Sequence, residues 1–273
     1  MSVEGIRVSS SWLDLRERAD AAARASGLVA HLRRRLPPRG PHVIHDLACG
    51  SGAMGRWLAP LLPGPQHWVL HDRDPDLLAL AAVDLPGRAA DGAAVDVETR
   101  LGDVTRLGRD DLAGATLVTA SALLDLLTGD ELAALVDTSA GGGRPVLVTL
   151  SVTGSVRLGP ADRLDSLVAA AFDAHQRRGT PRGRLLGPDA VEAAVEAFRR
   201  LGAEVVVEPS PWRLGSGDAA LAVEWLAGWI AAACEQEPEL VAETALYRRR
   251  RLREARAGVL AVAVDHADLL VLP

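Results

Sequence analysis

The stretch HDLACGSGAMG, from His45 to Gly55, decides the fold. It contains glycines at positions 50, 52 and 55, which is a G-x-G-x-x-G spacing. An apolar run, HVIHDL, precedes the first glycine, and an amphipathic run, AMGRWLAPLL, follows the second, so a strand, a tight turn and a helix are expected. Glycine allows the backbone to turn sharply and to approach a ligand closely. The stretch therefore predicts a ligand site at the carboxyl end of a strand in a parallel sheet.

The segments on either side of this turn alternate between short apolar runs and amphipathic runs. This alternation predicts an α/β fold, with a Rossmann-like, seven-stranded, mostly parallel sheet and helices on both faces. Helical additions are expected at the N-terminus and as a cap. The predicted strands are 42–47, 67–72, 97–103, 115–121, 144–152, 203–209 and 258–265.

The domain organisation follows from where the helical additions fall. Residues 1–40 are predicted to form an N-terminal helical extension, with Ser10 or Ser11 as its helix cap. Residues 41–273 are predicted to form the ligand-binding domain, with helical insertions at about 160–200 and 218–257. Inside this domain, Asp74 followed by Pro75 predicts one helix start, and a capping box from Thr128 to Glu131 predicts another.

Composition narrows the class of protein. The chain has 273 residues, a net charge of −6 and no lysine or asparagine, so a Schiff-base lysine and a P-loop lysine are excluded. An acidic chain disfavours a nucleic-acid partner unless it carries a local basic patch. Two cysteines, Cys49 and Cys234, suit free thiols in a reducing cytoplasm. The first residues do not resemble a signal peptide, and no uncharged apolar run reaches 18 residues, so we expect a cytoplasmic protein without a membrane partner.

Two acids distinguish the ligand classes that use such a turn. Asp72, 22 residues after Gly50, ends the second strand and is placed to accept hydrogen bonds from ribose hydroxyls, as in a dinucleotide site. Asp46, four residues before Gly50, instead opposes the diphosphate that a dinucleotide would place at the helix N-terminus. S-adenosylmethionine (SAM) has no phosphate, and its ammonium group suits an acid at this position.

These residues also carry a family resemblance. VIHDLACGSGAMGRWL (43–58) resembles motif I of the class I SAM-dependent methyltransferases, WVLHDRDPDLLALA (68–81) resembles motif II, and the third- and fourth-strand segments follow in order. One departure is Ala48, where the family often has glycine. The resemblance implies SAM as the cofactor, with Asp72 on the ribose and Asp103 beside the adenine amino group. The cofactor-binding residues that it implies are Asp46, Ala48, Gly50, Gly52, Asp72, Arg73, Asp103, Val104 and Ser121.

Catalytic candidates are expected above the carboxyl ends of the fourth and fifth strands. Ser121 ends the fourth strand, and a helical turn after it would place Ser121 and Asp125 on the same face. Asp125 could bind the acceptor, act as a base or be an exposed acid on a helix. His175 lies on an apolar stripe of the helical insertion, where it is either a base or a satisfied core residue. No metal is required by these residues.

The predicted function is methyl transfer from SAM to a small-molecule acceptor, with the acceptor atom (O, N or C) left open. The alternatives are an RNA methyltransferase that uses the arginine run 247–256, a non-catalytic protein with the same fold, and a nicotinamide dehydrogenase. The segment after the fourth strand, ASALLD, lacks the [ND]-P-P-[YF] clamp of amino-methyltransferases that act on DNA and release factors. A homodimer is left open as an assembly.

Overall fold

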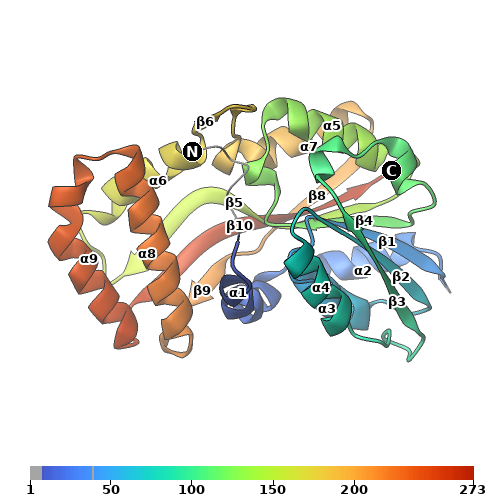
Figure 1. The fold of residues 1–273 in the computed structure, drawn as a ribbon, viewed down its shortest axis with the longest axis horizontal. Coiled ribbons are helices and arrows are strands. Elements are labelled where there is room, and N and C mark those ends of the chain that lie inside the picture. Colours follow the sequence, from blue (N-terminus) through green and yellow to red (C-terminus); the bar gives the residue numbers. More distant parts are fainter. Residues whose placement is uncertain (1–7, 39) are drawn as a thin grey trace.

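The computed structural model of the protein describes residues 8–38 and 40–273, so residues 1–7 of the predicted extension lie outside the described residues. One sheet runs through the molecule, in the order β3-β2-β1-β4-β5-β10-β8, with β9 paired to β10 (Figure 1). The first five strands pair in parallel, and β10 runs antiparallel to its neighbours. The strands of this sheet are β1 (His42–Leu47), β2 (Gln66–Asp72), β3 (Val95–Leu101), β4 (Leu117–Ser121), β5 (Val146–Gly159), β8 (Glu204–Pro209), β9 (Trp212–Leu214) and β10 (Ala261–Leu272).

The Rossmann-like fold is therefore confirmed, but the prediction of seven strands is wrong. The sheet has eight strands, because Trp212–Leu214, which lies beyond the predicted strand 203–209, also pairs with β10. Pro209 and Pro211 lack the N–H that a continuous ladder needs, so β8 ends and a separate β9 begins at Trp212. A short hairpin, β6 (Gly179–Thr180) with β7 (Gly183–Arg184), lies outside the sheet.

The helices divide into three groups (Figure 1). One hydrophobic cluster joins α2, α3 and α4 to one face of the sheet, and a second joins α5 and α7 to the other face. A third cluster gathers α6, α8 and α9, with α1 at its border, around the outer parts of β5 and β10. The helices are α1 (Ser10–Ala23), α2 (Ser26–Arg35), α3 (Ala53–Leu58), α4 (Pro75–Asp84), α5 (Gly129–Ala140), α6 (Asp165–Gln176), α7 (Ala190–Arg200), α8 (Ala219–Gln236) and α9 (Leu240–Arg256).

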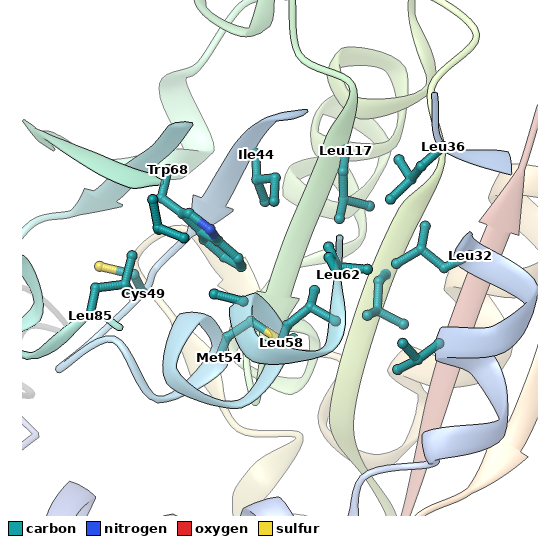
Figure 2. Packing of buried hydrophobic residues seen from close by; sticks show 14 of the residues in the cluster. Leu32, Leu36, Ile44, Cys49, Met54, Leu58, Leu62, Trp68, Leu85 and Leu117 are labelled. Carbon is teal, nitrogen blue, oxygen red and sulfur yellow. The ribbon is translucent and has the colours of Figure 1, made fainter. Parts of the chain in front are cut away.

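The first cluster holds the glycine turn against the sheet (Figure 2). Trp68 is fully buried at its centre, and the indole Nε1 donates a hydrogen bond to Gln66 Oε1 at 2.8 Å. A Cβ on Gly55 would collide with the side chain of Leu85, so the third glycine of the motif allows α3 to approach its neighbours closely. Burial of this cluster thus fixes the direction in which the turn leaves β1.

The helix starts match the sequence analysis at two of three places. Asp74 caps α4 ahead of Pro75, and Thr128 and Glu131 form the predicted capping box of α5. The predicted cap at Ser10 or Ser11 is wrong, because Ser9 Oγ accepts the hydrogen bond from Trp12 N. The N-terminal region forms two helices, α1 and α2, which are joined at Arg24 and Ala25.

The strands β5 and β10 continue beyond the parallel part of the sheet. The last parallel pair is Ser121 with Thr149, and from there β5 runs on to Gly159 beside β10. This extension carries α6, α8 and α9. Within the described residues one helical stretch, Ser216–Gln236, is long and apolar enough to cross a membrane, but core helices have the same composition, and Leu226 and Trp229 of this stretch are buried in the third cluster.

Candidate functional site

The backbone turns sharply where each of three parallel strands reaches the same edge of the sheet. Ala48 follows β1 with φ of 54°, Ala122 follows β4 with φ of 51°, and Leu150 follows the parallel part of β5 with φ of 59°. Positive φ is costly for residues with a Cβ, and such strain gathers at ligand sites. The carboxyl edge is therefore the place to look for a site.

The glycine turn lies at this edge and requires its glycines. Gly50 and Gly52 have φ of 55° and 88°. A Cβ on Gly50 would lie 3.3 Å from Leu13 Cδ1 of α1, and one on Gly52 would lie 3.1 Å from Ala81 Cβ of α4. A side chain at either position would thus strain the backbone and crowd a neighbouring helix.

Asp72 joins the turn to the next helix. Its Oδ2 accepts a hydrogen bond from Gly50 N at 2.8 Å, and its Oδ1 accepts one from Asp74 N at 3.0 Å. Each carboxylate oxygen has a second lone pair, so Asp72 can still accept hydrogen bonds from a ligand hydroxyl. Arg73, the next predicted cofactor residue, is exposed beside it.

Asp46 is buried on the strand that leads into the turn. Its side chain is 0% exposed, and Oδ1 accepts a hydrogen bond from Thr119 Oγ1 at 2.7 Å. Among the described residues, Oδ2 has no hydrogen-bond partner. Burial raises the pKa of Asp46 to about 7, while the hydrogen bond from Thr119 and the charge of Arg24 act in the opposite direction. Buried polar atoms without a hydrogen-bond partner are uncommon, so Asp46 is a candidate acceptor for a ligand donor.

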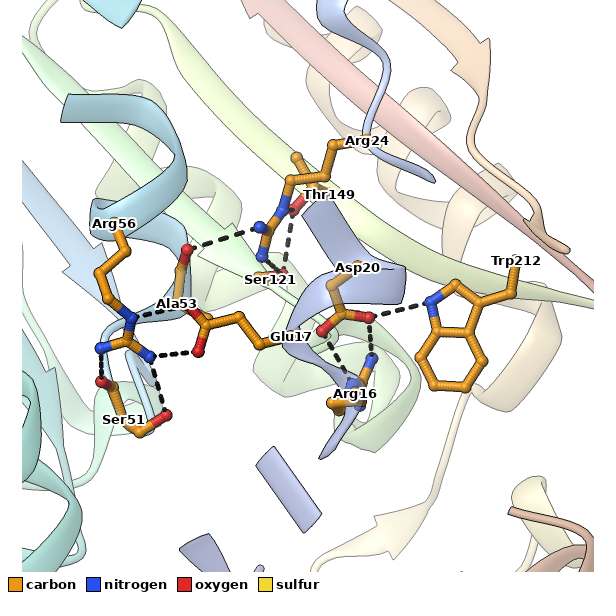
Figure 3. A network of polar contacts seen from close by, with 10 residues as sticks. All are labelled: Arg16, Glu17, Asp20, Arg24, Ser51, Ala53, Arg56, Ser121, Thr149 and Trp212. Carbon is orange, nitrogen blue, oxygen red and sulfur yellow. Dashed lines mark hydrogen bonds and ion pairs between the residues drawn. The ribbon is translucent and has the colours of Figure 1, made fainter. Parts of the chain in front are cut away.

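Ser121 and Thr149, at the ends of paired strands, hold a buried arginine. Thr149 Oγ1 donates to Ser121 Oγ at 3.0 Å, and the Arg24 guanidinium donates to both hydroxyls, at 3.4 Å and 3.3 Å. A third donation, at 3.4 Å, goes to the carbonyl oxygen of Ala53 at the start of α3 (Figure 3). Arg24 also stacks on Trp57, with Cζ 5.2 Å from the ring centroid.

Helix α1 is fastened over this edge by two polar clusters on either side of Arg24 (Figure 3). Arg56 of α3 donates to both carboxylate oxygens of Glu17, at 2.7 Å and 2.6 Å, and to Ser51 O at 2.5 Å. Asp20 accepts from Arg16 at 2.9 Å and 3.2 Å and from Trp212 Nε1 at 2.9 Å. The N-terminal helices thus form part of the wall of the site.

Asp103 and Val104 lie further along the same edge, after β3. Gly102 N donates to Asp72 O at 2.9 Å, which brings this segment next to the predicted ribose acid. The Asp103 side chain is partly exposed and accepts hydrogen bonds from Thr105 N and Oγ1, while Val104 is buried. The contacts described for Asp103 do not test its predicted role beside an adenine ring, so that role stays a prediction.

Asp125 lies beside the site, although not in the way the spacing suggested. Ala122, in its left-handed conformation, separates Ser121 from a short 3-10 turn at Leu124–Leu126, so no helical turn places Ser121 and Asp125 on one face. Burial raises the pKa of Asp125 to about 6, and the charges of Arg16 and Arg178 act against this rise. The carboxylate of Asp125 can therefore accept a proton near neutral pH. The charges that act on it come from Arg16 of α1 and from Arg178, which follows α6.

His175 lies in the cap, on α6, and faces Glu235 of α8. Its Nε2 is 3.5 Å from Glu235 Oε2, its Nδ1 is 3.4 Å from an Arg178 nitrogen, and burial lowers its pKa. Within the described part of the chain, no hydrogen bond or ion pair joins His175 to Ser121 or Asp125. The structure thus groups Asp46, Ser121 and the glycine turn at one edge and places His175 among cap residues.

No family model and no curated protein matches the chain. The fold is similar to that of the cyclopropane synthase MmaA2 from Mycobacterium tuberculosis, with 12% identity, a TM-score of 0.47, and coverage of 91% of this chain and 84% of that chain. It is also similar to a SAM-dependent methyltransferase from Geobacter sulfurreducens in complex with S-adenosyl-L-homocysteine, with 15% identity, a TM-score of 0.45, and coverage of 98% and 100%.

At these identities the likeness is one of fold alone. The central sheet of mostly parallel strands with flanking helices is Rossmann-like, as the sequence analysis expected.

Sequence reasoning missed the contribution of the N-terminal region to the site. Arg24, Glu17 and Leu13 were part of a segment expected to be an extension outside the ligand-binding domain. The spacing of charged residues in this segment fits a helix with one solvated face, and no local motif marks Arg24 as buried. Only the packing of α1 over the sheet edge reveals it.

Proposed function

We propose that this protein is a SAM-dependent methyltransferase that acts on a small-molecule acceptor in the cytoplasm. The observation that carries the proposal is Asp46, a buried carboxylate with an unpartnered oxygen on the strand that enters the glycine turn. A negative charge there opposes a bound diphosphate and complements the ammonium group of SAM. The site residues fit SAM: the turn can approach the ligand closely, Asp72 can hold the ribose, and Asp46 can accept the ammonium.

In this proposal the protein mainly positions the acceptor and SAM relative to each other. The methyl group on the sulfonium is already electrophilic, so the acceptor attacks the methyl carbon while the carbon–sulfur bond breaks and leaves a neutral thioether. Alignment of the two partners contributes roughly 7–11 kcal/mol to lowering the barrier. Helix α1, which is tied to the glycine turn at this edge, would help to exclude water during this step.

The acceptor proton, where there is one, would pass to Asp125. This residue follows β4 at the carboxyl edge, and its pKa of about 6 lets the carboxylate accept a proton at neutral pH. Ser121 would orient the acceptor through its hydroxyl. His175 is the weaker candidate, because its imidazole contacts Glu235 and Arg178 in the cap.

The arginine run does not favour an RNA acceptor. Arg250 pairs with Asp162, and Arg251 is 1% exposed and bonds to Asp165 and Glu254. These guanidinium groups hold α9 to the α6 region, at the end of the molecule away from β1 and the glycine turn (Figure 1). Arg250 and Arg251 of the run therefore have a structural role in the cap.

Calorimetric titration tests the ligand class. We expect S-adenosyl-L-homocysteine to bind and NADH not to bind. The 2′-deoxy analogue of S-adenosyl-L-homocysteine should bind at least about tenfold more weakly, because Asp72 loses a charged hydrogen bond. Asp72→Ala should abolish binding, whereas Asp76→Ala, an exposed acid in the first turn of α4, should not. Binding of NADH alone would replace the proposal with a dehydrogenase.

Turnover separates an enzyme from a non-catalytic binding protein. The purified protein, incubated with methyl-labelled SAM and a metabolite extract, should transfer label to a small molecule. Asp125→Asn should lower the rate by about 10²–10⁴-fold if the acceptor loses a proton in the step. Cofactor binding without label transfer to any extract would indicate a ligand sensor.

A further inference from the structure

Asp268 of β10 is a buried acid that joins three segments far apart in the sequence. The residue is 1% exposed. Its Oδ1 accepts hydrogen bonds from Leu150 N at 2.8 Å and from Ser210 Oγ at 2.5 Å, and its Oδ2 accepts one from Ala25 N at 2.8 Å. Hydrogen bonds to an ionised group are stronger than those between neutral groups. One side chain therefore connects the N-terminal helices, β5 and the segment between β8 and β9.

The hydrogen bond from Leu150 lies where β5 leaves the parallel part of the sheet. Leu150 has φ of 59°, and the register between β5 and β10 shifts at Asp268. A positive φ is unfavourable for a residue with a Cβ, so this turn needs an interaction that holds it. By accepting the N–H of the turned residue, the carboxylate fixes the end of the strand that carries Thr149, whose hydroxyl donates to Ser121.

The hydrogen bond from Ala25 lies at the junction between α1 and α2. Helix α1 reaches the glycine turn from this junction. Its Glu17 pairs with Arg56, which follows the turn on α3. Its Leu13 lies so close to Gly50 that a Cβ there would be 3.3 Å from Leu13 Cδ1. Because the junction is anchored to β10, α1 is held in one position relative to the turn.

The charge of Asp268 also acts on Arg24, the residue before this junction. Burial lowers the pKa of Arg24, and the charges of Asp20, Asp268 and Asp46 act against this change. Burial raises the pKa of Asp268, while its hydrogen bonds and the charge of Arg24 act in the opposite direction. Asp268 thus stabilises a buried guanidinium at the same junction that it anchors.

We propose that Asp268 is a positioning residue of the ligand site, which holds the α1–α2 junction and the end of the parallel part of β5 in the arrangement that binds ligand. This inference rests on the proposed function, in which the ligand is SAM. Asp268 acts through the segments that it joins, without touching the ligand. A ligand that binds only this arrangement must slow its opening by a factor of 1 + [ligand]/Kd.

The first arm of the experiment measures amide hydrogen exchange of the unmodified protein. The amides of Ala25 and Leu150 share one carboxylate, so we expect both to respond together to S-adenosyl-L-homocysteine. At a ligand concentration of about 100 times Kd, exchange at both should slow by about 100-fold, and exchange in α9 should slow less. No response at these two amides, or a response no larger than in α9, would overturn the inference. Absence of ligand binding would instead overturn the proposed function, and the second arm needs no ligand.

The second arm compares two substitutions in the ligand-free protein. Asp268→Asn keeps the size of the side chain but replaces one acceptor oxygen by an N–H₂ group. The amide oxygen is expected where two donors converge, so the N–H₂ group faces Ala25 N. Exchange in residues 10–35 should become faster by about 10- to 100-fold, the effect of one charged hydrogen bond.

Ser210→Ala is the matched control for this substitution. It removes the third hydrogen bond of the same carboxylate but neither of the two backbone links, so exchange in residues 10–35 should stay unchanged. Bound S-adenosyl-L-homocysteine should restore slow exchange in Asp268→Asn. Equal effects of the two substitutions, or exchange that becomes faster by the same factor in α9, would show that Asp268 only stabilises the fold and would refute its positioning role.

Discussion

The protonation state of Asp46 should couple ligand binding to pH. In the free protein burial raises its pKa to about 7, so the carboxyl group is about half protonated at neutral pH. A ligand ammonium interacts favourably only with the carboxylate, so ligand binding must expel the proton. Asp46→Asn removes this titration while keeping the shape of the side chain.

The expected size of the effect follows from that pKa. The carboxylate fraction is about 0.1 at pH 6, about 0.5 at pH 7 and about 0.9 at pH 8, so the affinity for S-adenosyl-L-homocysteine should rise about tenfold over this range. Burial lowers the pKa of His45, His71 and His266 to about 4, so these residues do not titrate in this window. Asp125, with a pKa of about 6, does titrate there, and Asp125→Asn is the matched control.

Calorimetry in buffers of different ionisation enthalpy measures the proton directly. The unmodified protein and Asp125→Asn should release about half a proton per ligand at pH 7, and Asp46→Asn should release almost none. A pH-independent affinity in the unmodified protein, or an unchanged slope in Asp46→Asn, would show that Asp46 does not face the ammonium.

The same pKa shift also acts on folding in the absence of ligand. Because the pKa of Asp46 is higher in the folded state than in the unfolded chain, the folded state binds more protons between about pH 4 and pH 7. The stabilisation is fully present below the unfolded pKa and is lost as the pH rises through about 7. Urea denaturation should show this loss, at most about 4 kcal/mol, and Asp46→Asn should not show it.

Three further substitutions test the local structure. Ala48→Gly should raise the free energy of unfolding by about 1 kcal/mol in urea denaturation, because φ is positive at this residue, and no gain would argue against a strained turn. Thr128→Ala should lower the melting temperature through a loss of about 1 kcal/mol, since the capping box of α5 loses its hydroxyl; an unchanged melting temperature would contradict this. Arg251→Met should cost about 3–5 kcal/mol in urea, because Asp165 and Glu254 lose a buried partner. The exposed Arg249→Met is its control, and equal costs for the two would refute the buried network.

The sequence predicted those parts of the fold that local physics determines. The first strand was placed at its observed bounds, 42–47, because an apolar run meets a glycine turn there. Asp74 with Pro75 and Thr128 with Glu131 were identified as helix starts, because a cap is recognised by residues within one turn. The glycine turn was also recognised, because its residues are consecutive. Its two flanking acids, Asp46 and Asp72, lie in the strands just before and just after the turn and its helix, so the sequence identifies them too.

The parts that the sequence did not predict depend on contacts between distant segments. The burial of Arg24 results from α1 packing over the ends of β4 and β5, and an arginine at a helix end is usually solvated. The extent of β5, which reaches Gly159, depends on pairing with β10, more than a hundred residues later. The strand β9 was not predicted, because its three residues form a strand only through their pairing with β10.

The central claim is that a glycine turn flanked by Asp46 and Asp72 binds the sulfonium cofactor. A crystal structure of the protein with S-adenosyl-L-homocysteine tests it most directly. The account predicts that the ribose hydroxyls lie within hydrogen-bond distance of Asp72 and that the amino group lies at the free oxygen of Asp46. A ligand bound elsewhere, or one that leaves both carboxylates without contact, would contradict the account.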